Sequence, residues 1–398
     1  ATRTFEHCRA WVENGVDVTV VTCAPNFPQG RVYPDYKNRL IQHECLEGIN
    51  VIRVWSYMAR NVGFVRRVAD YLSFSFMAFW ASLFRSYDVI VATSPQFFTT
   101  FTAFALSKIR RKPWVFELRD LWPESIDAVG AVKSRRLISL LEKIELHLYR
   151  DAALVVAVTD AFKENLVRRG IPPQKISVIT NGVDSKRFRP SSKDQTLVQE
   201  LGLNGKFVIG YLGTHGLAHG LDFIVRSLAG FGDQSVHFLF VGDGAEKQKV
   251  LELAGSLGVT NATFIDSVPK SEMARYLSAF DAALVPLRRS ETFKTVIPSK
   301  IFESAAMEKP ILLGVDGQAR KIVEQYEAGI FYEPENSEDF QLKVSRLLQE
   351  AGLYKALQAG CRTLADAYDR ERLANIMLDD LKAVVKQHSS RRTAKPLL

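Results

Sequence analysis

The fold of this chain is decided by residues 206–222, KFVIGYLGTHGLAHGLD. An apolar, β-branched run is followed at once by a glycine-rich turn and then by residues with helical spacing. A strand, a glycine turn and a helix in this order are typical of a doubly wound α/β domain. Glycines at such a turn let the backbone approach a phosphate, although the same turn also occurs without a ligand. The predicted contacts are Gly213, Thr214, His215 and His219.

The alternation of strand, turn and helix continues toward the C-terminus. A second turn, VGDGAEK at residues 241–247, follows another apolar run and predicts nucleoside contacts at Gly242, Asp243 and Gly244. Turns of this kind are also common in α/β proteins that bind nothing there. The expected strands of this half are 206–213, 236–242, 263–266, 282–286, 310–314 and 329–332.

The N-terminal half has the same organisation. Its expected strands are 16–22, 51–55, 88–93, 113–118 and 153–158, with helices at 64–84, 95–108 and 134–149. The alternation is interrupted at 180–190, which is rich in turn formers and charge. We therefore predict two doubly wound, Rossmann-like α/β domains with parallel sheets, residues 1–181 and 182–370. Residues 371–398 are expected to form a helix that packs back toward the first domain, followed by a polar tail.

The composition limits the class of protein. The 398 residues are 47% hydrophobic and 24% charged, as in globular domains, which excludes a disordered or collagen-like chain. The four cysteines have no disulfide or zinc spacing and fit a reducing cytosol. A net charge of +8 favours an anionic partner, which could be nucleic acid, a phosphorylated substrate or an acidic membrane surface. Nucleic acid is not expected, because the basic residues belong to no recognisable reader motif.

The stretch TFKTVIPSKIFESAAMEKP, residues 292–310, carries the most specific pattern. Pro298 is suited to the first position of a helix, which then places Ser299, Lys300 and Glu303 near its start. Lys300 could neutralise a phosphate, Ser299 offers a hydroxyl and an amide, and Glu303 could accept hydrogen bonds from ribose hydroxyls. The alternative is an exposed Lys–Glu pair at i,i+3 that contributes only tenths of a kcal/mol.

Residues 68–84, VADYLSFSFMAFWASLF, form the longest apolar run. This run is slightly short of the ~20 residues that a spanning helix needs. We predict a helix buried on the sheet. The alternative is a partly exposed aromatic face beside Arg66, Arg67 and Arg85, which would suit a membrane interface.

The order of these motifs is similar to that of a known family. NGVD at 181–184, residues 210–222, VGDG at 241–244 and SKIFESAAMEKPIL at 299–312 together resemble retaining glycosyltransferases of family 4, which have the GT-B fold. FELRDLWPES at 116–125 and YDVIVATSPQ at 87–96 agree with its N-terminal domain. More narrowly, the chain resembles bacterial enzymes of O-antigen and exopolysaccharide synthesis, including N-acetyl-fucosamine transferases.

This resemblance implies a retaining sugar transfer from a nucleotide sugar, expected to be UDP-linked. The donor would bind residues 182–370, and a polyprenyl-diphosphate-linked saccharide would bind residues 1–181 as acceptor. The enzyme would lie peripherally on the inner face of the bacterial cytoplasmic membrane. No D-x-D motif is present, so we expect neither a metal nor another cofactor. The alternatives are a non-catalytic nucleotide-sugar-binding subunit and a GT-B nucleotide-sugar epimerase.

The resemblance also assigns residues, with departures. Glu303 matches the second Glu of the family's E-x7-E motif, but Thr295 stands where the first would fall. The basic residues that usually bind the pyrophosphate after the first strand are missing as well. Arg119 occupies a position where many relatives have a His. The substitutes proposed for the donor are His215, Arg288, Arg289, Lys294, Val296, Ile297 and Lys300; Arg119, Asp120 and Lys300 are the catalytic candidates, and Glu124 an acceptor contact.

The family comparison also bears on where the sequence begins. The first domain of these enzymes normally starts with a strand and a glycine-bearing loop. This chain opens at residues 1–11, which have the pattern of the helix that follows that loop. We therefore expect one strand and its loop to be missing from this sequence.

Overall fold

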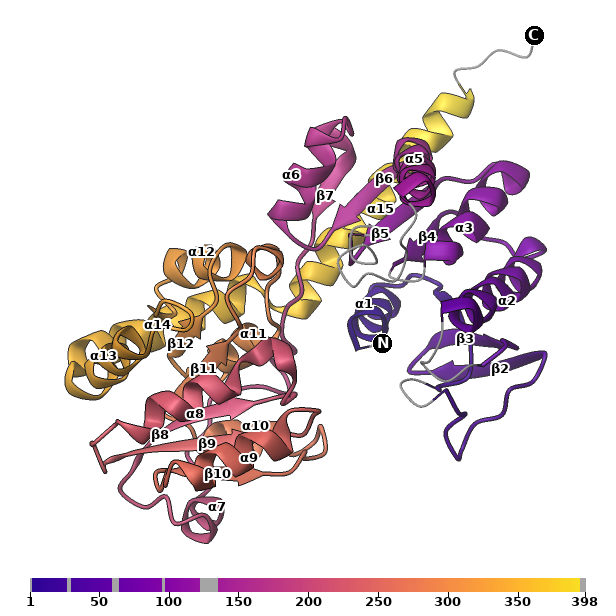
Figure 1. The fold of residues 1–398 in the computed structure, drawn as a ribbon. Coiled ribbons are helices and arrows are strands. Elements are labelled where there is room, and N and C mark those ends of the chain that lie inside the picture. Colours follow the sequence, from indigo (N-terminus) through magenta and orange to yellow (C-terminus); the bar gives the residue numbers. More distant parts are fainter. Residues whose placement is uncertain (1, 27–29, 59–63, 95–96, 122–134, 394–398) are drawn as a thin grey trace. The chain divides into compact units, whose positions relative to one another are not determined.

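The computed structural model describes residues 2–26, 30–58, 64–94, 97–121 and 135–393. It divides the chain into two compact units (Figure 1). The first consists of Ala1–Thr180 together with Leu373–Leu398, and the second of Asn181–Arg372. The first junction falls one residue before the boundary expected from the sequence. The helix α15, Arg370–Thr393, carries the chain back to the first unit.

The second unit is built on a parallel sheet of six strands in the order β10-β9-β8-β11-β12-β13. From β8 the chain moves outward through β9 to β10, and it then returns to the other side of β8 at β11. Ligands of open α/β sheets bind where the strand order reverses, at the carboxyl ends of the strands. The strands are β8 Phe207–Leu212, β9 Val236–Val241, β10 Ala262–Ile265, β11 Ala282–Pro286, β12 Ile311–Gly314 and β13 Gly329–Phe331.

Alternate residues of these strands are buried on opposite faces of the sheet. Val208 belongs to one hydrophobic cluster, and its neighbour Ile209 belongs to the other. Both faces therefore need helices, as the near-continuous apolar runs of the sequence predict. The helices are α7 Gln195–Glu200, α8 Leu221–Ala229, α9 Lys247–Ser256, α10 Met273–Ser278, α11 Lys300–Ala306, α12 Gln318–Gln325, α13 Ser337–Gln349 and α14 Ala351–Ala367.

The first unit contains two runs of paired strands. A parallel group has the order β4-β5-β6-β7, and a smaller group has the order β1-β3-β2. The strands are β1 Thr19–Thr22, β2 Ile41–Leu46, β3 Ile49–Val54, β4 Ile90–Thr93, β5 Trp114–Leu118, β6 Leu154–Ala157 and β7 Ile176–Val178. The remaining helices are α1 Thr2–Glu13, α2 Phe64–Leu83, α3 Phe97–Arg110, α5 Arg135–Asp151 and α6 Asp160–Arg168.

An antiparallel hairpin in this unit departs from the all-parallel prediction. Strands β2 and β3 pair antiparallel across a two-residue turn, Glu47–Gly48. Both turn residues have positive φ, 49° and 81°, which is the conformation of the type I′ turn that joins right-twisted strands. Strand β2 is not predicted by the sequence pattern, because its three consecutive polar residues, Gln42, His43 and Glu44, interrupt the alternation of apolar and polar residues.

The prediction that residues 68–84 form a buried helix is only half right. The helix α2 packs Phe74 and Ala78 against β3, but Phe76 and Trp80 on another face are 62% and 48% exposed. The expected C-terminal helix is present as α15, which extends to Thr393. In the part of the chain that the structure describes, no helix is long and apolar enough to cross a membrane.

Candidate functional site

The two glycine turns of the second unit fit into one another. Gly213 donates its N–H to the Val241 carbonyl at 2.9 Å, and His215 donates its N–H to the Asp243 carbonyl at 2.9 Å. A Cβ at Gly242 would lie 1.9 Å from the Gly213 oxygen, and Gly242 has a φ of +151°. Glycine is therefore required for the turns after β8 and β9 to approach this closely. Together they form a backbone cradle at the carboxyl edge of the sheet.

Replacing Gly242 by alanine should destabilise this unit strongly. The added methyl group would overlap backbone rather than a movable side chain, so we expect a loss of at least about 2 kcal/mol in the free energy of unfolding. Gly255→Ala is the matched control, because Gly255 lies in α9 with open space around its Cα. That change should be neutral or stabilising by up to about 1 kcal/mol. Urea denaturation measures the free energy of unfolding of both variants. Equal stabilities would show that the two turns do not require glycine at position 242.

The rings of Tyr211, His215 and His219 lie close together at the turn after β8. Tyr211 is buried, donates its hydroxyl to the Thr214 carbonyl at 2.5 Å, and lies 5.6 and 6.0 Å from the rings of His215 and His219. Burial lowers the pKa of both histidines to about 4, so both rings are neutral at pH 7. The His215 ring is fully buried beneath the turn. The predicted donation by its side chain to a phosphate stays a prediction, and its backbone holds the two turns together.

Lys300 brings a buried ammonium group to this cradle. Its Nζ lies 3.8 Å from the centre of the Tyr211 ring and would be 3.0 Å from a Cβ on Gly213. Among the described residues the ammonium has no hydrogen-bond partner. Burial lowers the pKa of Lys300 to about 7, whereas the nearby Glu303 carboxylate raises it. A buried cation that lacks a hydrogen-bond acceptor is costly to the fold, which indicates a place for an anion.

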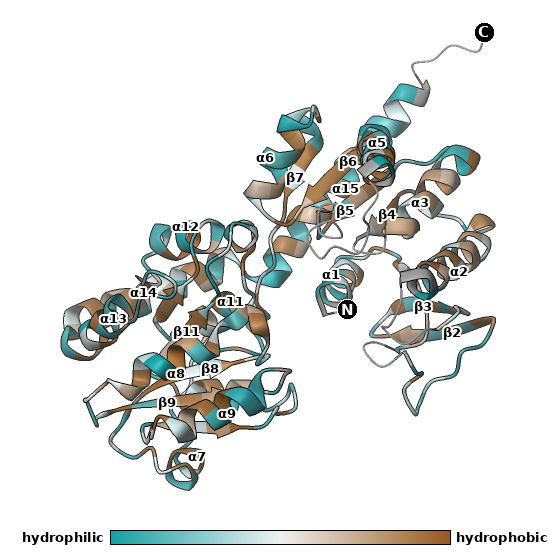
Figure 2. Cartoon of the chain, in the orientation of Figure 1, coloured by the Kyte–Doolittle hydropathy of each residue, from teal (hydrophilic) through white to brown (hydrophobic). Residues whose placement is uncertain are grey.

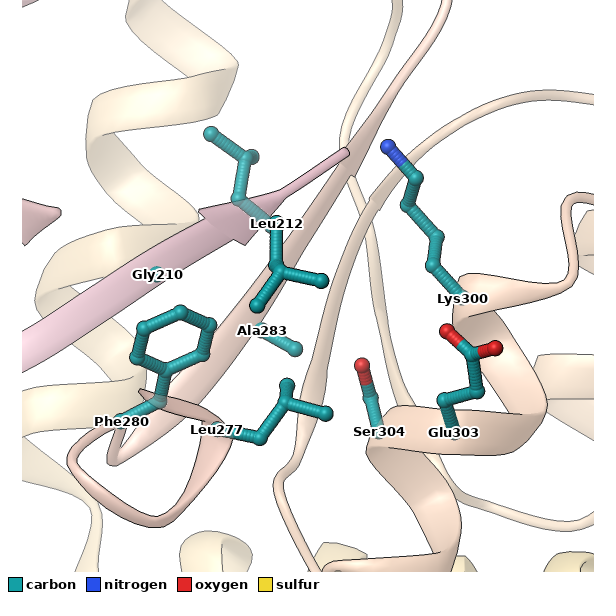
Figure 3. Close-up of a pocket in the computed structure, with 9 residues that line it drawn as sticks. Gly210, Leu212, Leu277, Phe280, Ala283, Lys300, Glu303 and Ser304 are labelled. Carbon is teal, nitrogen blue, oxygen red and sulfur yellow. The ribbon is translucent and has the colours of Figure 1, made fainter. Parts of the chain in front are cut away.

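Glu303 lies one turn beyond Lys300, and both side chains extend from α11 toward the end of β8 (Figure 3). They line a small pocket together with apolar residues of β8, α10 and β11. Burial raises the pKa of the Glu303 carboxyl, and the positive charges of Lys270, Lys300 and Arg187 oppose that rise. The predicted alternative, an exposed Lys–Glu pair, is therefore wrong for both residues.

The other predicted donor contacts differ in their surroundings. Arg288 is engaged in the fold: its Nε donates to the Leu217 carbonyl at 2.8 Å, and its guanidinium pairs with Asp222. Arg289 is 64% exposed and pairs with Glu333. The Thr295 hydroxyl donates to the Thr292 carbonyl within its own short helix. Asp243 and Ser299 are exposed, whereas Lys294, Val296 and Ile297 are half-buried; their roles stay predictions.

Lys247 is a further residue of this site that the sequence pattern did not predict, although it belongs to the second glycine turn. The Lys247 Nζ donates to the carbonyls of Gly242 and Ile265 at 3.0 and 3.2 Å and pairs with Asp266. It thus joins the turn after β9 to the end of β10. In the sequence, the feature that could have indicated this role is the position of the lysine shortly after the glycines of VGDGAEK.

The N-terminal candidates belong to the other unit. Arg119 and Asp120 follow β5 and are half-buried, and the Arg119 N–H donates to the Ser94 hydroxyl at 2.8 Å. Buried Arg3 on α1 supports this strand end, because its Nε donates to Glu117 at 2.9 Å. Glu124 lies outside the described residues. Within the described ranges, no group of three or more His, Cys, Asp or Glu side chains could hold a metal ion.

Models of known protein families match residues in both units. A model of the "Glycosyl transferase 4-like domain" matches residues 1–182, and a model of "Glycosyl transferases group 1" matches residues 206–350. The chain thus carries a glycosyl transferase 4-like domain followed by a group 1 glycosyltransferase domain. The second match covers the two glycine turns, Lys300 and Glu303, so the cradle lies in the group 1 domain.

Individual relatives of this glycosyltransferase are distant. It is 26% identical over 201 residues to the probable glycosyltransferase WbjE of Pseudomonas aeruginosa, spanning half of each chain. It is 22% identical to WcaI of Escherichia coli K12, a putative colanic acid biosynthesis glycosyl transferase, over 78% of this chain and 76% of that protein. The structure of Anabaena Alr3699/HepE with UDP-glucose superposes with a TM-score of 0.65 at 19% identity, covering 85% and 87% of the chains. The GT-B fold of this chain is thereby established.

Proposed function

We propose that this glycosyltransferase transfers a sugar from a UDP-linked donor, with retention of configuration, to a lipid-linked saccharide acceptor. One observation carries the proposal: the buried Lys300 ammonium, without a partner among the described residues, beside the two-glycine cradle. That combination suits a diphosphate, because backbone amides and one cation can share its charge. The UDP-glucose complex of the structural neighbour Alr3699/HepE supports a uridine nucleotide.

The reaction needs little covalent chemistry from the protein. The bond between the anomeric carbon and the diphosphate oxygen breaks, and UDP leaves with the electron pair. A new bond forms from an acceptor hydroxyl oxygen, whose proton passes to the departing diphosphate or to solvent. The cradle and Lys300 would stabilise the charge that develops on the diphosphate, which is commonly the largest catalytic term. Glu303 would hold the ribose. In the first unit, Arg119 would contact a phosphate or a sugar hydroxyl, and Asp120 would bind the acceptor.

The names of similar proteins support a role in polysaccharide synthesis, from which we propose the acceptor and the place of action. WcaI is named for colanic acid biosynthesis, and another relative is named for teichuronic acid biosynthesis. We infer a polyprenyl-diphosphate-linked saccharide used at the inner face of the cytoplasmic membrane, in O-antigen, capsule or exopolysaccharide synthesis. N-acetyl-fucosamine is one candidate for the transferred sugar.

Mass spectrometry of products tests the proposal. The enzyme is incubated with UDP-, GDP- and dTDP-linked sugars, UDP-N-acetyl-fucosamine among them, and with a polyprenyl-diphosphate monosaccharide. We expect the acceptor to gain the mass of one sugar with a UDP-linked donor, without added metal, and an anomeric configuration by NMR equal to that of the donor. Conversion of the donor in the absence of acceptor would favour the epimerase, and inversion or a strict metal requirement would overturn the mechanism.

A further inference from the structure

Helix α2 presents an apolar stripe to solvent. Leu72, Phe76, Trp80 and, just past the helix end, Phe84 recur at intervals of four residues and are 48%, 62%, 48% and 81% exposed. This interval places them on one side of the helix. Four large apolar side chains in an unbroken row are unusual on a solvated surface and mark an interaction site. Figure 2 shows α2 at the surface of its unit, with apolar residues along it.

The rest of α2 is firmly held, so the stripe does not arise from a loosely packed helix. Phe74 and Ala78 pack against Ile52 and Val54 of β3. On a further face, the Ser75 hydroxyl donates to the Phe98 carbonyl at 2.8 Å and lies 2.7 Å from the Thr102 hydroxyl of α3. Two faces of α2 are therefore held by β3 and α3, and the third face, which carries the stripe, is exposed to solvent.

Cations flank the stripe at both ends. Between Asp70 and Arg85 the sequence has no charged residue, while Arg66 and Arg85 are exposed at the two ends of the helix. The Arg110 guanidinium lies at the Arg85 end, where it donates to the Arg85 carbonyl at 3.4 Å. The charge of the whole unit agrees: it contains 29 Lys and Arg against 19 Asp and Glu, net +10, whereas the second unit contains 23 against 25, net −2.

We propose that this stripe docks the enzyme on an anionic lipid bilayer, with α2 lying in the membrane interface. Aromatic residues on one face with arginines beside them are the composition of interfacial helices. A second copy fits less well, because two-fold pairing of the stripes would place exposed arginines of one copy against those of the other. This docking rests on the proposed function, because the stripe would be the surface that brings the enzyme to its lipid-linked acceptor.

Vesicle flotation with the full chain tests the proposal. The double variant Phe76→Ser/Trp80→Ser removes apolar surface without opening the core, and Leu342→Ser on α13, 56% exposed in the other unit, is the matched control. On vesicles of phosphatidylglycerol and phosphatidylcholine, we expect the double variant to bind at least ten-fold more weakly and the control to bind as wild type does. Arg66→Glu/Arg85→Glu should also bind more weakly, and wild-type binding should fall with salt and on pure phosphatidylcholine.

Two results would overturn the proposal. One is unchanged flotation of the aromatic double variant. The other is a wild-type dimer that the same variant dissociates, in light scattering, with no binding of either protein to vesicles; the stripe would then cover a second copy. UDP affinity is measured in parallel by calorimetry and should be equal in all these variants. Absent UDP binding by the wild type would defeat the proposed function but leave the vesicle result intact, so the two failures are separable.

Discussion

Lys300→Met is expected to remove most of the affinity for UDP and nearly all sugar transfer. Hydrogen bonds to charged groups contribute about 1.5–3 kcal/mol, so the dissociation constant of UDP should rise about 10- to 150-fold. Turnover should fall by a further factor of about 100, because charge on the diphosphate grows in the transition state. Titration calorimetry and initial rates at saturating acceptor measure the two effects. Lys249→Met, on the exposed surface of α9, is the control and should behave as wild type.

The stability of the same variant should change in the opposite direction. The Lys300 ammonium is buried without a hydrogen-bond acceptor among the described residues, so the methionine protein should melt at or above the wild-type temperature at pH 7. Burial lowers the pKa of Lys300 to about 7 from the 10.5 of a free lysine. Between these values the unfolded chain binds more protons than the folded one, so wild-type stability should rise with pH. The melting temperatures of wild type and variant should therefore converge from pH 7 toward pH 10.

Ligand binding gives a third measurement for Lys300. A diphosphate beside the lysine favours the ammonium form, so UDP binding at pH 8 should take up protons. The heat of binding should then vary with the ionisation enthalpy of the buffer for wild type, and should not vary for Lys300→Met. Normal UDP affinity together with a loss of thermal stability in this variant would show that Lys300 is structural, and the diphosphate assignment would fail.

The fold was largely predictable from the sequence because its strands are short apolar runs that end in turn formers. Residues 236–242 and 282–286 were expected as strands and are observed as β9 and β11 with nearly the same bounds. The hairpin of β2 and β3 was not expected, because its turn depends on a positive φ at Glu47, a residue type that seldom adopts one. Local pattern predicts elements well and misses those that depend on an unusual backbone conformation.

The candidate site was less predictable because its properties depend on burial. The sequence shows that Lys300 and Glu303 are three residues apart. Only the folded structure shows that the Lys300 ammonium is buried against the Tyr211 ring. The same applies to α2, where apolar residues on its buried and exposed sides look alike in the sequence. Lys247 was not predicted because its partners are mostly backbone carbonyls. A pattern of side chains in the sequence does not show which carbonyls a lysine will reach.

Glu303→Ala should weaken UDP binding by removing recognition of the ribose. The Glu303 carboxylate lines the same small pocket as Lys300, near the end of β8. Hydrogen bonds from ribose hydroxyls to a buried carboxylate contribute about 1.5–3 kcal/mol each, so the loss of even one should lower the affinity at least about ten-fold. A ribose role also predicts selectivity: wild type should bind UDP at least ten-fold more tightly than 2′,3′-dideoxy-UDP, and the alanine variant should bind both equally.

The comparison of the two nucleotides separates recognition from a general electrostatic effect. If Glu303 served only to balance the charge of Lys300, its removal would leave Lys300 with fewer opposing charges and would strengthen the binding of both nucleotides alike. Glu291→Ala is the matched control, because this carboxylate is 89% exposed and pairs with Lys294 at 2.7 Å. It should preserve the preference for UDP. A Glu303→Ala protein that still prefers UDP over the dideoxy nucleotide by the wild-type factor would show that the ribose is held elsewhere, because selectivity for hydroxyl groups cannot survive the loss of the group that accepts their hydrogen bonds.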